Sequence, residues 1–125
     1  MWPNFDGKPY TRAELAAHIN VCDFSQWRDK NGKLGKPTFI TLHNTAVPDI
    51  ALWMSWAPAK RQQYILNMQP YYEKKGWQAG PHFFVTPQAD ICAFGFSDLM
   101  KAGTHASCFN NGSIGIEMVG DFDKE

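Results

Sequence analysis

The sequence predicts an α/β fold in which a mixed central β-sheet is flanked by helices. Two segments carry helical signals, near residues 11–20 and 58–69. Four runs are rich in β-branched and aromatic residues, are bounded by turn-forming residues and are typical of strands: Phe39–His43, His82–Thr86, Ile91–Phe94 and Ile114–Val119. At 125 residues, with 44% apolar and 14% aromatic side chains, the chain is long enough to bury one core.

The first forty residues are expected to wrap around this sheet and to contain a short helix. Thr11 followed by Glu14 forms the capping-box pattern that begins a helix, and Leu15 and Ile19 then lie on one apolar face. The segment 28–37 contains five charged residues, two glycines and a proline, which indicates a solvated loop before the first core strand.

The predicted core alternates strands with a second helix. Thr38–His43 contains no turn-forming residue, and we expect it to be a buried strand. The second helix has Pro58 in its first turn, and Pro70 is expected to interrupt it. The segments 82–86 and 91–94 are separated by residues with turn chemistry, which predicts an antiparallel pair.

Composition and charge exclude several kinds of partner. Twelve basic and twelve acidic residues cancel, so the chain lacks the positive field that nucleic-acid and anionic-membrane binders use. No apolar run approaches the ~20 residues that span a bilayer, and the N-terminus lacks a signal-peptide pattern. Three cysteines without a CxxC pair indicate neither a disulfide framework nor a thiolate zinc site. We therefore expect a cytoplasmic protein that binds neither nucleic acid nor membranes.

Side chains with catalytic chemistry lie near the strand ends. His43 closes one strand, His82 begins another, and His105 lies in the loop before the last strand. Glu117 lies within that last strand between apolar residues, where an ionised carboxylate needs a partner or a raised pKa. A glutamate beside a zinc-bound water is well placed to take its proton, because zinc lowers the pKa of that water to ~7. These residues fit a zinc hydrolase in which histidines bind the metal and Glu117 is the general base.

Each of these assignments has a structural alternative. His43 fits either a metal ligand or a hydrogen-bonded strand end, and His82 fits a hydrogen-bonded core position or a contact behind the ligands as well as a ligand. The histidines lack the i, i+4 spacing that places two ligands on one helix. Trp53, Trp56 and Trp77 fit core or loop anchors as well as a platform for a sugar.

Three stretches together resemble a known family: FITLHNTA, GWQAGPHFFVTPQADICAF and GTHASCFNNGSIGIEMVGDFD. In their order they are similar to the zinc-dependent N-acetylmuramoyl-L-alanine amidases, which include phage endolysins, bacterial wall-recycling amidases and peptidoglycan recognition proteins. The resemblance covers about Phe39 to Asp123, which is most of the chain.

The resemblance implies a reaction and a set of site residues. It implies hydrolysis of the amide between N-acetylmuramic acid and the L-alanine of the stem peptide, with peptidoglycan or muramyl peptides as substrate and Zn²⁺ as cofactor. It implies that His43 is a zinc ligand, that Glu117 is the general base and that His105 contacts substrate. Asn44 and Thr45, which follow the ligand histidine, are expected to line the cleft.

The chain departs from the family pattern in two places. Pro81 stands where some phage enzymes carry a catalytic tyrosine, so that role is not transferred. The family's other two zinc ligands lie beyond Glu125, and one histidine cannot complete a tetrahedral site. The later segment also covers the sheet in relatives, so an open face or edge is expected, which a missing C-terminal segment or a homo-oligomer would cover.

We expect a single amidase-like domain over 1–125, with an N-terminal helix and loop extension at 1–37 and a C-terminally incomplete catalytic core at 38–125. Three explanations of the incomplete site stay open at this point. The chain is a piece of a longer protein, or His82 and His105 complete an unusual site, or the chain is a zinc-free module that binds peptidoglycan. The expected location is that of an endolysin of phage or prophage origin, which accumulates in the cytoplasm and reaches the wall after the membrane is opened.

Overall fold

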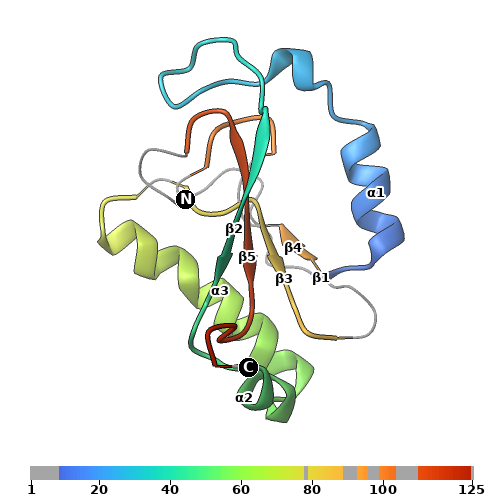
Figure 1. Ribbon diagram of the computed structural model, residues 1–125, viewed down its shortest axis with the longest axis vertical. Helices are drawn as coiled ribbons and strands as arrows, with labels where there is room; N and C mark the ends of the chain where they lie inside the picture. Colours follow the sequence, from blue (N-terminus) through green and yellow to red (C-terminus); the bar gives the residue numbers. More distant parts are fainter. Residues whose placement is uncertain (1–8, 78, 89–92, 96–98, 104–109, 125) are drawn as a thin grey trace.

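A five-stranded sheet with the order β1-β4-β3-β5-β2 forms the centre of the protein (Figure 1). The computed structural model describes residues 9–77, 79–88, 93–95, 99–103 and 110–124. The strands are β1 Pro9–Tyr10, β2 Phe39–Asn44, β3 Phe83–Val85, β4 Ala93–Gly95 and β5 Ser113–Met118. β2, β5 and β3 pair in parallel, whereas β4 pairs antiparallel with β3 and with β1. The predicted mixed α/β class and the antiparallel pair are therefore confirmed.

The helices lie on different sides of this sheet. They are α1 Arg12–Asn20, α2 Ile50–Ser55 and α3 Pro58–Lys74, with a 3₁₀ turn at Phe24–Gln26. Figure 1 shows α1 on the side of β1, away from α2 and α3. Within the described residues, none of these helices has both the length and the apolar character that crossing a bilayer requires.

The face of the sheet toward α2 and α3 carries the larger apolar core. Trp53, Ile65, Phe84 and Val119 are buried there, and Tyr72 and three other partly buried side chains pack against them. Asp49 caps α2, because its carboxylate accepts a hydrogen bond from the amide of Leu52 at 2.7 Å, and this cap orients Trp53 toward the sheet.

The opposite face carries a smaller core around Phe83 and Leu99. Phe83 and Phe84 are adjacent in β3, so their side chains point to opposite faces of the sheet. Leu15 of α1 packs on this smaller core. The predicted start of α1 is confirmed, since the Thr11 hydroxyl accepts a hydrogen bond from the amide of Glu14 at 3.2 Å.

The prediction that Pro70 interrupts the second helix is wrong. α3 continues through Pro70 to Lys74 and has Lys75 as its C-cap, and Gly76 follows with a positive φ of 82°, as is common just after a helix. Pro70 is exposed, so the carbonyl group that loses its donor can bond to water instead. Tyr72, beyond the proline, packs against the core, and this packing keeps the last turn helical.

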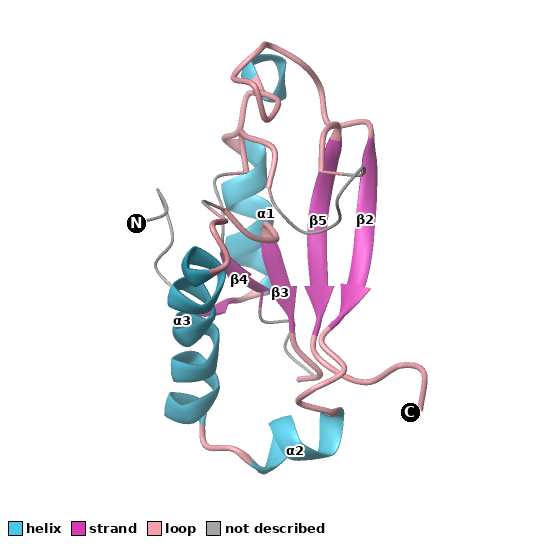
Figure 2. Ribbon diagram, turned by 90° about the vertical axis from the view of Figure 1, so that its left-hand side faces the viewer, coloured by secondary structure: helices cyan, strands magenta, loops and turns pink. Residues whose placement is uncertain are grey.

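The prediction that the first core strand is buried is also wrong. β2 lies at the edge of the sheet and pairs, within the described residues, only with β5 (Figure 2). Ile40 and Leu42 are 62% and 59% exposed, because no described element packs over their face of the strand. Among the described residues, this face of β2 is therefore open.

Candidate active site

His43 and Glu117 lie directly opposite each other on neighbouring parallel strands. In the register of β2 and β5, His43 pairs with Glu117, and in that of β3 and β5, Phe84 pairs with the same glutamate. Residues paired in this way share one face of the sheet, and neighbouring strands lie about 4.8 Å apart. The pairing therefore brings the imidazole and the carboxylate to neighbouring positions on one face of the sheet.

All three side chains line a cavity of about 510 Å³ between the sheet and α3. The cavity lies near the carboxyl ends of the parallel strands, which is the usual place for a site in an open α/β sheet. The helix side of the wall is aromatic and includes Tyr64 and Tyr72. The cavity therefore has an aromatic wall on the side of α3, and His43 and Glu117 lie on the side of the sheet.

Burial raises the pKa of Glu117 to about 7. The side chain is half-buried, and among the described residues no hydrogen bond or ion pair reaches its carboxylate. Removal from water disfavours the charged form when no partner compensates for it. Glu117 therefore exchanges a proton close to neutral pH, which suits a general acid or base.

Two tyrosines of α3 lie close to this carboxylate, and the sequence reasoning missed them. Burial, and after it the negative charge of Glu117, raises the pKa of both Tyr64 and Tyr72. The Tyr64 hydroxyl donates a hydrogen bond to the carbonyl oxygen of Val47 at 3.0 Å, which fixes α3 to the loop after β2. Tyr64, Met68 and Tyr72 recur every four residues, a spacing that places them on one helix face and could have revealed them.

His82 is buried behind this site, with both ring nitrogens hydrogen-bonded. Its Nδ1 accepts from the amide of Gly115 at 2.9 Å, and its Nε2 lies 2.7 Å from the carbonyl oxygen of Lys101. This pattern defines the tautomer with hydrogen on Nε2. Neither nitrogen has a lone pair left for a metal ion.

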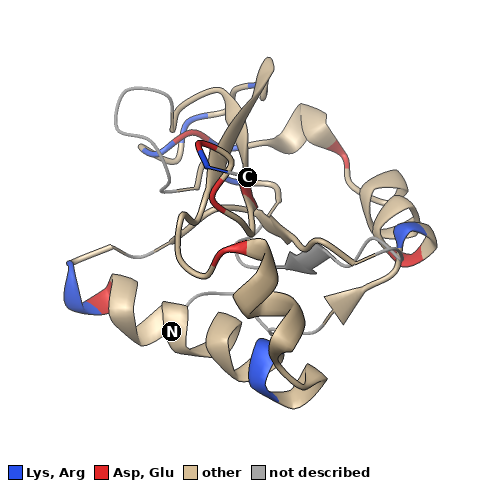
Figure 3. Ribbon diagram, turned by 60° about the horizontal axis from the view of Figure 1, so that its bottom comes forward, with Lys and Arg blue, Asp and Glu red and all other residues tan. Residues whose placement is uncertain are grey.

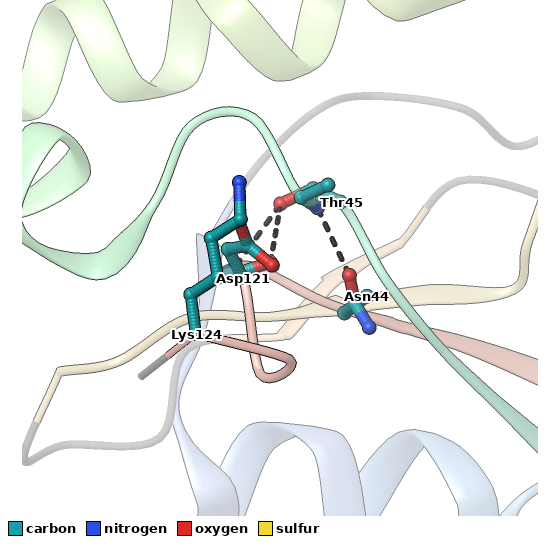
Figure 4. Close-up of polar contacts among 6 residues, drawn as sticks. Asn44, Thr45, Asp121 and Lys124 are labelled. Atoms are coloured by element: carbon teal, nitrogen blue, oxygen red, sulfur yellow. Dashed lines mark hydrogen bonds and ion pairs between the residues drawn. The ribbon is translucent and has the colours of Figure 1, made fainter.

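The loop after β2 brings Thr45, but not Asn44, to the cavity. Thr45 lines the cavity, and its hydroxyl accepts from the amide of Gly120 at 3.0 Å and donates to the carbonyl oxygen of Pro48 at 3.2 Å. Asn44 instead accepts a hydrogen bond from the amide of Ala46 at 3.1 Å, which stabilises the local turn (Figure 4). The roles of Asn44 and Thr45 in substrate binding stay predictions, and His105 lies outside the described residues.

The tryptophans divide between core and cavity. Trp53 is fully buried and Trp56 packs against the same core, so these two are structural anchors. Trp77 lines the cavity, and its ring centroid lies 4.9 Å from that of Tyr72. Only Trp77 of these three is therefore placed to meet a ligand in this cavity.

The described residues fit a metal site only in part. His43 offers an imidazole nitrogen at the cavity, but no three His, Cys, Asp or Glu side chains of the described ranges are grouped to hold a metal ion. A tetrahedral zinc site needs three protein ligands and a water. The part of the chain described here does not by itself supply that set.

The fold and the site define a class, an α/β domain whose cavity places a carboxylate beside an imidazole, two groups that can take part in general acid–base catalysis. The family model of the N-acetylmuramoyl-L-alanine amidases matches residues 33–125. The chain belongs to this amidase family, and peptidoglycan is the substrate that membership implies. No curated protein and no solved structure gave a match.

Proposed function

We propose that this protein hydrolyses the amide between N-acetylmuramic acid and the L-alanine of the stem peptide, with Glu117 as general base. The observation that carries the proposal is the pairing of His43 with Glu117 in one cavity of an amidase-family domain. Phe84 supplies an apolar wall on one side of this pair, and the proposed reaction uses a water held at the pair.

The protonation behaviour of Glu117 supports this role. A carboxyl group with a pKa of about 7 is partly ionised at neutral pH and can accept a proton from the attacking water. The same group, once protonated, can donate to the amine that leaves. One side chain thus serves both proton transfers. The half-buried position of Glu117 makes this possible, because it brings the pKa of the carboxyl close to neutral pH.

Zinc is the cofactor that we propose on the basis of the family, with His43 as the described residue that could bind it. A bound zinc ion would activate water and polarise the amide carbonyl. Among the described residues the ligand set is incomplete, so zinc would need further ligands besides His43. Zinc analysis of the purified protein, before and after treatment with a chelator, tests this part, and we expect His43→Ala to lower the bound zinc.

Digestion of purified peptidoglycan tests the proposed reaction. We expect new L-alanine amino termini to appear without new reducing sugar ends, because an amidase cuts no glycosidic bond. Glu117→Gln, which keeps the size of the side chain, is expected to lower this release at least 100-fold, in the range of a lost general base. Asp123→Asn removes an exposed carboxylate and is the matched control. Release at the native rate by Glu117→Gln would refute the assignment of the base.

A second function, binding of peptidoglycan without cleavage, is favoured by one observation. The described residues contain no group of three metal-binding side chains. In that case the native protein would sediment with purified walls but release no L-alanine termini at any zinc concentration, and Glu117→Gln would bind as well as the native protein.

A further inference from the structure

The mouth of the cavity carries a lysine that the proposed reaction does not use. Lys75 lies at the C-terminal end of α3, and its Nζ is 4.6 Å from the ring centroid of Tyr71 and 5.2 Å from that of Trp77. All three residues line the cavity. The positive charge is therefore held at the opening rather than left on a freely moving side chain.

The backbone fixes this arrangement. Gly76, with its positive φ, turns the chain after α3, and the amide of Trp77 then donates to the carbonyl oxygen of Tyr72 at 3.0 Å. The Trp77 ring packs on Tyr72, and Lys75 lies over the rings of Tyr71 and Trp77. Ring faces attract an ammonium group and leave its N–H groups free to donate hydrogen bonds.

Lys75 is also the one lysine or arginine in the described wall of the cavity, and no described carboxylate forms an ion pair with it. Lys74, its neighbour, does not line the cavity. Figure 3 shows that the charged residues of α3 gather at its two ends, with none between. The mouth thus has a positive charge that no carboxylate of the described residues neutralises, while Glu117 makes the interior negative when ionised.

We propose that Lys75, held by Tyr71 and Trp77, binds a carboxylate of the stem peptide and so selects the residue that follows L-alanine. This proposal rests on the proposed amidase function. Lys75 and Glu117 line the same cavity, and the Trp77 ring under the Lys75 ammonium packs on Tyr72, which lies near Glu117. A stem peptide whose first amide lies at Glu117 would continue through this cavity, so a carboxylate close to L-alanine is the group that Lys75 would meet.

The second residue of the stem peptide occurs in two forms, D-glutamate with a free carboxylate and D-isoglutamine with an amide. These two forms have nearly the same shape and differ by one charge. The rate of cleavage of two soluble muramyl tripeptides that differ only at this residue therefore measures what Lys75 recognises.

The native protein is expected to cleave the D-glutamate substrate with a kcat/KM about 10-fold higher than that for the isoglutamine substrate, mainly through KM. This is the factor that corresponds to one exposed charge-assisted hydrogen bond of about 1.4 kcal/mol. Lys75→Met should abolish the preference, Lys75→Arg should keep most of it, and Lys74→Met should leave it unchanged. Equal cleavage of both substrates by the native protein, or an unchanged preference in Lys75→Met, would overturn the proposal and leave the amidase function intact.

Equilibrium binding separates this proposal from the reaction itself. Calorimetric titration of Glu117→Gln with the same two tripeptides should show tighter binding of the D-glutamate form. In the double variant that also carries Lys75→Met, this preference should be lost. A carboxylate preference without any cleavage by the native protein would support the subsite and refute the hydrolase. Binding of neither tripeptide, together with no cleavage, would overturn both.

Discussion

Replacement of Glu117 by glutamine should stabilise the metal-free protein above neutral pH and leave it unchanged in acid. Burial raises the pKa of this carboxyl from its ordinary value of 4.5 to about 7, so the folded state binds the proton more tightly than the unfolded state. The native protein therefore has its full stability below about pH 4.5 and loses part of it as the pH rises from there to about 7. Glutamine cannot ionise and escapes this loss.

The size of the effect follows from the pKa. At 1.36 kcal/mol per pKa unit, the rise corresponds to about 3 kcal/mol, which solvent screening of a half-buried group reduces to about 2 kcal/mol. For a chain of this length that is a rise in Tm of about 6–8 °C.

Urea unfolding followed by tryptophan fluorescence, in a chelator and at about pH 4 and pH 8.5, measures this difference. We expect the Glu117→Gln variant and the native protein to coincide at the lower pH and to differ by about 2 kcal/mol at the higher one. Asp123→Asn, which alters an exposed carboxylate, should show no such pattern. A gain of equal size at both pH values would mean that packing, not ionisation, is responsible, and no gain at pH 8.5 would refute the buried-carboxylate argument.

Three further predictions concern the stability of the fold. Gly103→Ala should destabilise the protein by about 2 kcal/mol in urea unfolding, because the added methyl group would collide with the carbonyl oxygen of Gly80 and lie 3.0 Å from the His82 ring; native-like stability would show that this packing can relax. Phe84→Ala should cost about 3–5 kcal/mol in the same assay, since the ring is fully buried beneath the cavity, and a loss below 1 kcal/mol would contradict that burial. Thr11→Ala should cost about 1 kcal/mol by removing the cap of α1, whereas an unchanged melting curve would indicate that the cap hydrogen bond is not formed in solution.

Glu117 and His43 could be predicted as site residues from the sequence, because the alternation of side chains along a strand can be recognised from neighbouring residues alone. Glu117 alternates with Ile116 and Met118 along its strand, and His43 ends a run of strand-forming residues. The parallel register that places His43 opposite Glu117 could not be predicted, because it depends on the order of strands far apart in the chain. Residue chemistry suggested a site of histidines with Glu117, and the family resemblance singled out His43 as the histidine that binds the metal.

Predictions from local sequence failed where tertiary packing determines the structure. A proline usually ends a helix, but at Pro70 the packing of Tyr72 on the core outweighs one lost hydrogen bond. The last turn of α3, beyond this proline, carries residues that line the cavity mouth. The exposed Leu42 had the same β-propensity as a buried residue, because propensity does not report whether a strand lies at an edge. α2 was missed, although Asp49 followed by apolar residues is a signal for its cap.

Glu117 and His43 lie on strands that differ in how many neighbouring strands they pair with. Glu117 is carried by β5, which is bonded to a strand on each side, whereas His43 is carried by β2, whose outer backbone has no strand beside it in the described structure. The carboxylate is thus the fixed reference point of the pair. Displacements that alter the distance between acid and imidazole will come from the histidine strand, and amide exchange in β2 should report them first.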